Sequence, residues 1–195
     1  MENVLFIKCC PRPEGSSRTL ALADEFIKTY GIFHEISVYT EDLYAQVLSP
    51  YGIEEIEKRD DLISSRSYGD PMFDKARMFA AADTIVCAAP YWDLSFPARL
   101  KSYVEELCVN GLTFHYTEHG SEGLSVFRKF IYITTSGGYP GAKDYGTQYM
   151  HAIANFLGNG EFYAITAEGL DIIGNDVDEI MAKAFVNAKQ LAEKV

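Results

Sequence analysis

Several features that would assign a function directly are missing from this chain of 195 residues. No hydrophobic run approaches the roughly 20 residues that a membrane-spanning helix needs, and the first residues lack the basic start of a secretory signal. Lysine and arginine number 17 against 28 acidic residues, which gives a net charge of −11. Since there is no basic stripe either, we expect no nucleic-acid partner, no membrane association and a cytoplasmic location.

Cysteine is scarce, and its spacing is not that of a metal site. The four cysteines are Cys9, Cys10, Cys87 and Cys108, and none of them forms a C-x-x-C. A disulfide framework is typical of small secreted chains rather than of a chain this long. We therefore expect four reduced thiols and no bound metal.

The glycine-rich signatures of nucleotide-binding proteins are also absent. The loop after the first predicted strand contains neither G-x-G-x-x-G nor the lysine of a P-loop. An anionic cofactor would have to be bound by local devices, such as backbone N–H groups and the positive ends of helices.

What the chain does have is a regular alternation of short apolar runs and segments of helical periodicity. Strands are predicted at residues 4–8, 33–39, 84–89, 127–135 and 161–166. Helices are predicted between them and after the last one, including a segment at 52–64, whereas 112–124 reads as a long connection. This order predicts one α/β domain over residues 1–195, with a flavodoxin-like five-stranded parallel sheet (order 2-1-3-4-5) and helices on both faces.

In such a sheet, ligands bind beyond the carboxyl ends of the strands, which directs attention to three loops. The first contains Ser16, Ser17, Arg18 and Thr19 at the start of a helix. Hydroxyls, free backbone donors and a helix N-terminus suit a terminal phosphate. The alternative is that a serine only caps the helix.

The second loop contains the only tryptophan of the chain. Pro90 ends strand pairing, and Tyr91, Trp92 and Leu94 then offer a broad apolar wall with backbone N–H groups between them. Such a wall suits a planar ring that is bound by its face and recognised at its rim. The alternative is that the aromatic residues pack into the core or a subunit interface.

The third loop ends a strand with Gly137 and Gly138, which allow the backbone to approach a planar ligand closely. A plain turn is the alternative. Taken together, the three loops indicate a ligand with one phosphate and one flat ring.

The chain also resembles the flavodoxin-like NAD(P)H:quinone oxidoreductases, and among them the bacterial FMN-dependent NADH azoreductases. The resemblance runs nearly end to end. It is carried by the stretches "APYWDLSFPARLKSYVE", "NGLTFHYTEHGSEGL", "ITTSGGYPG" and "FLGNGEFYAITAEGLD".

The resemblance implies an FMN cofactor, NADH or NADPH as electron donor, and a quinone or azo compound as acceptor in a ping-pong reaction. It also implies a homodimer with active sites at the subunit interface. The residues implied for FMN are Cys10, Ser16, Ser17, Arg18, Thr19, Pro90, Tyr91, Trp92, Asp93, Leu94, Ser136, Gly137 and Gly138. Tyr116 and Tyr139 are implied for the substrate, and no side chain is an obligatory acid or base.

The sequence departs from the family pattern at three of these positions. Cys10 and Arg18 stand where serines are usual, and an arginine can pair directly with a phosphate. Asp93 replaces a common asparagine, and the carboxylate is expected to alter the cofactor's potential. His115, His119 and His151 are candidates for proton delivery, with surface histidines as the alternative. The competing function is an FMN-containing electron carrier without a small-molecule substrate. A third possibility is that the first loop binds another nucleotide and that no flavin is bound.

Overall fold

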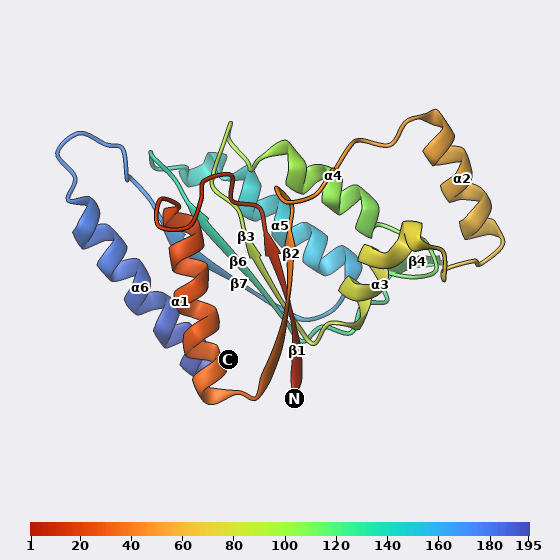
Figure 1. Cartoon of the computed structure of the whole chain (residues 1–195), viewed down its shortest axis with the longest axis horizontal. Helices are drawn as coiled ribbons and strands as arrows, with labels where there is room; N and C mark the ends of the chain where they lie inside the picture. The colour runs from red at the N-terminus through yellow and green to blue at the C-terminus, as the bar shows by residue number, and fades with distance from the viewer.

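The main sheet has five parallel strands in the order β2-β1-β3-β6-β7 (Figure 1). The computed structural model describes all residues, 1–195. The strands are β1 (Glu2–Lys8), β2 (Ile36–Asp42), β3 (Thr84–Ala88), β6 (Lys129–Thr135) and β7 (Glu161–Ala167). The predicted flavodoxin-like order is confirmed. The registers place all the carboxyl ends at one edge of the sheet.

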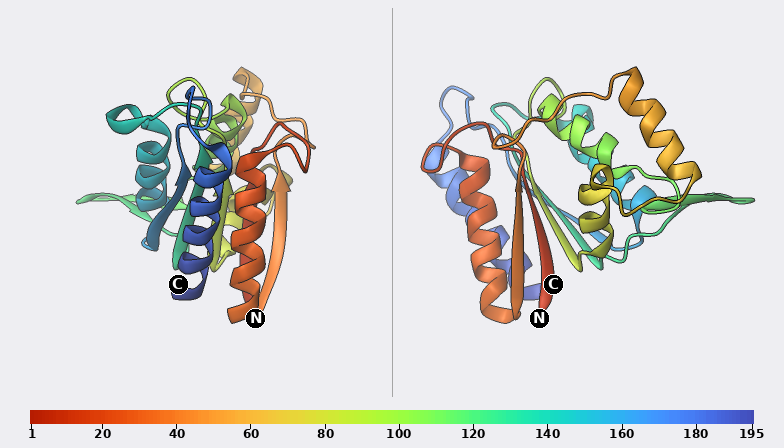
Figure 2. Two further views of the ribbon diagram at one scale, coloured as in Figure 1. Left: turned by 90° about the vertical axis from the view of Figure 1, so that its left-hand side faces the viewer. Right: turned by 45° about the vertical axis from the view of Figure 1, so that its right-hand side comes forward.

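Helices cover both faces of this sheet, as predicted (Figure 2). On one face lie α1 (Arg18–Phe33) and α6 (Val177–Lys194), and on the other lie α3 (Asp74–Ala81), α4 (Ala98–Leu107) and α5 (Tyr145–Leu157). Short 3-10 turns, η1 (Pro71–Phe73) and η2 (Gly141–Lys143), precede α3 and α5. None of the helices is long and apolar enough to cross a membrane.

Side-chain alternation along the buried strands creates the two cores. In β1, Val4 and Phe6 join the cluster under α1 and α6, whereas Leu5 and Ile7 join the cluster on the opposite face. The same alternation holds in β3 and β6. Because successive strand residues point to opposite faces, a strand covered on both sides must be apolar at every position.

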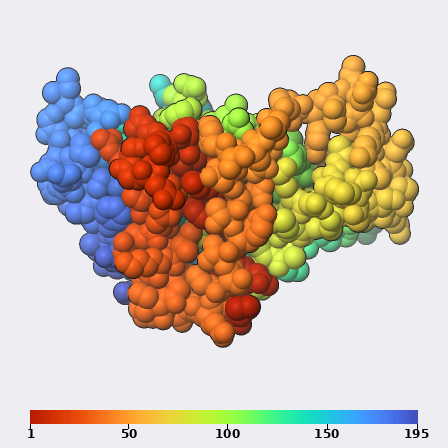
Figure 3. Space-filling view, viewed as in Figure 1, coloured from red at the N-terminus to blue at the C-terminus, as the bar shows by residue number.

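The segment after β2 contains the predicted helix, α2 (Ile53–Ser64). None of its residues is buried, and only Leu62 and Ile63 pack against a small cluster made by Phe73, Ala76 and Val109. This helix lies away from the main sheet and forms part of a lobe at one side of the molecule (Figure 3).

The segment at 112–124, which was predicted only as a long connection, contains a β-hairpin. Its antiparallel strands are β4 (Phe114–Thr117) and β5 (Gly120–Gly123). Phe114 anchors the hairpin by packing on Phe156 of α5, with ring centroids 4.5 Å apart. The rest projects from the body of the molecule (Figure 2). Strands this short, with only Phe114 buried, give no alternation that a sequence reading can detect.

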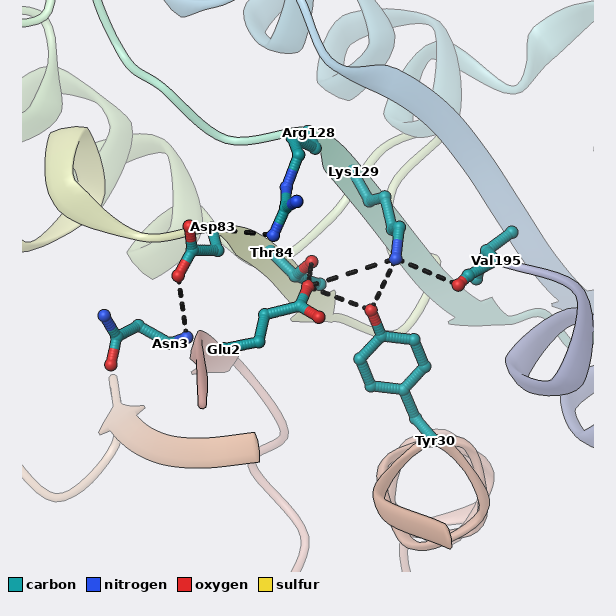
Figure 4. A network of polar contacts seen from close by, with 8 residues as sticks. All are labelled: Glu2, Asn3, Tyr30, Asp83, Thr84, Arg128, Lys129 and Val195. Carbon is teal, nitrogen blue, oxygen red and sulfur yellow. Dashed lines mark hydrogen bonds and ion pairs between the residues drawn. The ribbon is translucent and has the colours of Figure 1, made fainter. Parts of the chain in front are cut away.

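A polar network closes the amino-terminal end of the sheet, opposite the loops (Figure 4). Glu2 accepts hydrogen bonds from Tyr30 at 2.9 Å and from Thr84. Lys129 donates to the Tyr30 hydroxyl at 2.7 Å and to the Val195 carbonyl at 2.9 Å. The network therefore connects β1, α1, β3, β6 and the end of α6.

Candidate functional site

The predicted loops meet in one cleft at the carboxyl edge of the sheet. The lining residues come from the segments after β1, β3 and β6, joined by a fourth segment after β7. They are Pro11, Arg12, Ser17, Arg18, Thr19, Pro90, Tyr91, Trp92, Thr135, Ser136, Gly137, Leu170 and Asp171.

The first loop presents free backbone donors to this cleft. Ser17 is the N-cap of α1, and its hydroxyl accepts a hydrogen bond from the N–H of Leu20 at 3.2 Å. The capping alternative is therefore true of Ser17. The N–H groups of Arg18 and Thr19, however, donate to no acceptor in the chain. Free N–H groups at a helix start are suited to an anion.

Charged side chains add to this preference. Arg12 and Arg18 both line the cleft, and a single carboxylate, that of Asp171, lies opposite them. The guanidinium of Arg18 is 3.4 Å from the Asp171 carboxylate. In a chain with a net charge of −11, Arg12 in the first loop and Arg18 at the start of α1 form a local positive site.

The second loop contains a tight turn whose central residues adopt left-handed conformations. Trp92 and Ser95 exchange backbone hydrogen bonds of 2.8 and 3.1 Å. Between them, Asp93 has φ 50° and Leu94 has φ 68°, the geometry of a type I′ turn. The N–H groups of Asp93 and Leu94 are unpaired and stand at the rim.

The aromatic side chains of this loop are not part of the core. Trp92 is 44% exposed, so the alternative that it packs into the interior is wrong for this chain. Tyr91 donates its hydroxyl to the carbonyl of Lys143 at 3.1 Å, while its N–H donates to Thr135 at 2.9 Å. The loop is thereby fixed to the end of β6, with the indole at the mouth of the cleft.

The third loop is tied to the segment after β7. The Asp171 N–H donates to the Gly137 carbonyl at 2.8 Å, and the Ser136 hydroxyl donates to Gly138 at 2.8 Å. A Cβ on Gly137 would collide with the Asp171 carboxylate, whereas one on Gly138 would meet nothing within 4 Å. Glycine at 137 therefore makes room for a side chain of the protein itself.

Some of the predicted residues lie beside the cleft rather than in its lining. Cys10 is 3% exposed within the core, and burial raises the pKa of its thiol to about 11. The Ser16 hydroxyl donates to the Pro13 carbonyl at 2.9 Å. Asp93, Leu94 and Gly138 belong to the turns at the rim. The roles assigned to all of these residues stay predictions.

The two tyrosines predicted for the substrate lie apart. Tyr139 is exposed next to the third loop, and its hydroxyl accepts a hydrogen bond from Asn175 at 2.8 Å. Tyr116 is 71% exposed on the projecting hairpin and does not line the cleft. Within one chain, only Tyr139 is near the site.

The histidines proposed for proton delivery are also away from the cleft. His115 is 3.3 Å from Glu122 within the hairpin, and His119 lies at its turn. His151 stacks on Phe162, with ring centroids 4.7 Å apart. None of them lines the cleft.

The fourth segment of the cleft was not predicted from the sequence. Leu170 and Asp171 follow β7 and reach the same edge, and Pro11, Arg12 and Thr135 complete the lining. Because the carboxyl ends of parallel strands share one edge, the rule that selected the first three loops would also have selected the residues after the fifth strand.

The parallel sheet and the cleft beyond its carboxyl ends define a flavodoxin-like α/β protein with a candidate anion site at the start of α1. The family described as having a flavodoxin-like fold matches residues 2–192. Two relatives have names that include FMN-dependent NADH:quinone oxidoreductase. One, from Clostridium acetobutylicum, is 38% identical, and the other, from Caldicellulosiruptor saccharolyticus, is 36% identical, each over the full length of both chains. The chain belongs to this flavodoxin-like family.

Solved structures agree with this fold. An azoreductase from Bacillus anthracis superposes with a TM-score of 0.90 at 24% identity and covers all of both chains. An FMN-dependent NADH-azoreductase from Bacillus anthracis, solved with FMN, has a TM-score of 0.87 at 22% identity, with 100% of this chain and 99% of that chain covered.

Proposed function

We propose that the protein is an FMN-dependent oxidoreductase that transfers two electrons from NADH to quinones or azo compounds. The observation that carries this proposal is the cleft itself, in which free N–H groups, arginines and an exposed aromatic wall meet at one sheet edge. The full-length similarity to FMN-dependent NADH:quinone oxidoreductases supports it.

The residues present fit FMN in two separate regions. The N–H groups of Arg18 and Thr19, together with the Arg18 side chain, suit the phosphate. Trp92 and Tyr91 supply an apolar surface suited to a flat ring. The unpaired N–H groups of Asp93, Leu94, Gly137 and Gly138 are donors suited to its polar rim.

When bound, FMN would supply the redox chemistry by accepting a hydride from NADH and passing electrons to the acceptor. The chain's own residues bind and orient it. Backbone donors fixed by the turn at Trp92 and Ser95 stabilise negative charge without reorganising, because the turn is held by hydrogen bonds at both ends.

The finer parts of the proposal concern assembly and location. We place the protein in the cytoplasm as one domain, residues 1–195, that forms a homodimer. The hairpin supports the dimer, because it projects from the body of the molecule (Figure 2). Its Tyr116 is exposed and is therefore available to the substrate of a second copy. Tyr139, beside the third loop, would contact the substrate in its own subunit.

The decisive experiment is anaerobic addition of NADH to the protein loaded with FMN. We expect the visible flavin absorbance to bleach, and then to return when a quinone or an azo dye is added. The competing function is an electron carrier, and it predicts no bleaching until a partner reductase is present. A protein that takes up no FMN would refute both functions.

Dimer formation is tested separately, by sedimentation. Tyr116→Ala should raise the KM for the acceptor and leave FMN affinity unchanged. An unchanged KM, or a monomer that is fully active, would contradict the role given to the hairpin.

A further inference from the structure

Asp171 occupies an unusual place in the cleft. Its backbone is fixed, because its N–H donates to Gly137 at 2.8 Å and the N–H of Leu170 donates to Ser136 at 3.1 Å. The side chain rests against Gly137, whose missing Cβ makes room for it. A carboxylate is thus held beside a site whose other charged groups are arginines.

The carboxylate has acceptor capacity that the chain does not use. Its Oδ1 atom lies 3.4 Å from the Arg18 guanidinium, and no donor of the chain bonds to Oδ2. The side chain is 77% exposed, so this ion pair contributes little to stability. Stability alone therefore does not account for the position of Asp171.

The carboxylate of Asp171 and the guanidinium of Arg18 are suited to different ligand groups. An ionised carboxylate only accepts hydrogen bonds, so it repels a phosphate and is suited to hydroxyl groups. A guanidinium only donates, and its planar fork suits a phosphate. Since Arg18 has five donors, it can keep one on Asp171 and use others for an anion.

The neighbouring hydroxyls do not provide the same capacity. Thr19 and Thr135 are buried and bonded to each other at 2.6 Å, and the Ser136 hydroxyl is used by Gly138. Asp171 is therefore the side chain in the lining with free strong acceptors for a hydroxylated ligand.

We propose that Asp171 and Arg18 divide the recognition of the FMN tail, an inference that rests on the proposed function. Asp171 accepts hydrogen bonds from the hydroxyls of the ribityl chain, and Arg18 binds the phosphate. Their ion pair holds the acceptor and the donor next to each other before the cofactor arrives. Asp171 is thus a binding residue for the part of the cofactor between ring and phosphate.

Three flavins that differ only in the tail test this division. FMN has ribityl chain and phosphate, riboflavin has the chain alone, and lumiflavin has neither. Dissociation constants are measured by flavin fluorescence for the wild type, Asp171→Ala, Asp171→Asn and Arg18→Ala. Glu14→Ala is the matched control, because it removes one negative charge from an exposed position in the first loop outside the cleft lining.

Asp171→Ala should raise the dissociation constants of FMN and riboflavin by about tenfold or more, as expected for loss of a hydrogen bond to a charged group. The dissociation constant of lumiflavin should not change. Asp171→Asn keeps the shape of the side chain and one acceptor oxygen, so the loss of affinity for FMN and riboflavin should be smaller. Arg18→Ala should raise the dissociation constant of FMN alone, because only FMN has a phosphate. Glu14→Ala should bind all three flavins like the wild type.

Several results would overturn the proposal. One is unchanged riboflavin binding in Asp171→Ala, which would reduce Asp171 to a support for Arg18. Another is an equal loss of lumiflavin binding in this variant, which would indicate a general structural effect. Melting temperatures identify misfolded variants. If Asp171→Ala does not fold, the comparison of the three flavins is made with Asp171→Asn. If the wild type binds none of the three flavins, the proposed function itself fails.

Discussion

The hydroxyl oxygens of Thr19 and Thr135 lie 2.6 Å apart in a buried hydrogen bond that joins the first turn of α1 to the end of β6. These residues are distant in sequence, and both line the cleft. The bond therefore fixes the phosphate-facing helix start relative to the loop that carries Gly137.

Replacing one partner of this bond should be costly. Thr135→Val keeps the shape but leaves the Thr19 hydroxyl buried without a partner, so we expect the free energy of unfolding to fall by about 1–3 kcal/mol. The double variant Thr19→Val/Thr135→Val should lose less than the sum of the two single losses. Urea unfolding measures both effects, and strict additivity would show that the hydroxyls do not interact.

The turn after β3 stores local strain. Leu94 has φ 68°, a conformation that costs a residue with a Cβ about 1 kcal/mol or more. Leu94→Asn should raise the free energy of unfolding by up to about 1 kcal/mol, because asparagine tolerates this region. Leu94→Val, with a branched Cβ, should lower it. Equal free energies of unfolding for the two variants would mean that the turn is not strained.

The two glycines of the third loop should respond differently to alanine. A Cβ at 137 collides with the Asp171 carboxylate, whereas one at 138 meets nothing within 4 Å. Gly137→Ala should therefore displace Asp171 and raise the dissociation constant for FMN at least tenfold. Gly138→Ala is the matched control and should change it much less. Fluorescence titration decides, and equal effects would contradict this geometry.

Asp93 should lower the reduction potential of the bound cofactor. Asp93 is exposed and follows Trp92, which lines the cleft, and a negative charge near the bound ring opposes the addition of electrons. Asp93→Asn removes the charge and should raise the two-electron potential by roughly 30 mV, which corresponds to about 1.4 kcal/mol. Equilibration with a reference dye measures the potential. A fall, or no change, would place the carboxylate away from the redox centre.

Glu2 should make stability depend on pH in the acid range. Burial by itself would raise the pKa of Glu2, but hydrogen bonds from Thr84 and Tyr30 and the charge of Lys129 outweigh it, so the pKa lies below the usual 4.5. A pKa lowered in the folded state stabilises the protein above the unfolded value, and this stabilisation is lost as the pH falls through the folded value.

We therefore expect Glu2→Gln to reduce the free energy of unfolding at pH 7 by about 1–3 kcal/mol. The difference from the wild type should shrink as the pH falls below 4.5. Urea titrations across this range measure it. A difference that does not vary with pH would show that the charge of Glu2 contributes nothing.

The sheet could be predicted because buried parallel strands show directly in the sequence. Thr84–Ala88 is buried at every position, and its apolar run is readable without any structure. The hairpin could not be predicted, because only Phe114 in it is buried and its anchor, Phe156, is far away in the chain.

The candidate site was predictable in part for a related reason. Loops that follow apolar runs can be located, so Arg18, Trp92 and Gly137 were found. The segment that contains Asp171 could have been located by the same rule, but the contacts of Asp171 with Arg18 and Gly137 are visible only in the structure.

By itself, the sequence determined the order of the five main strands and of the helices, the sheet edge at which the candidate site lies, and the residue types available there. Periodicity and turn chemistry are local properties, so they are legible along the chain. Only the tertiary structure decided which side chains face one another across the cleft, which N–H groups stay unpaired, and that the residue beside Gly137 is a carboxylate of the chain. Those relations depend on distances between segments remote in sequence, which packing alone sets.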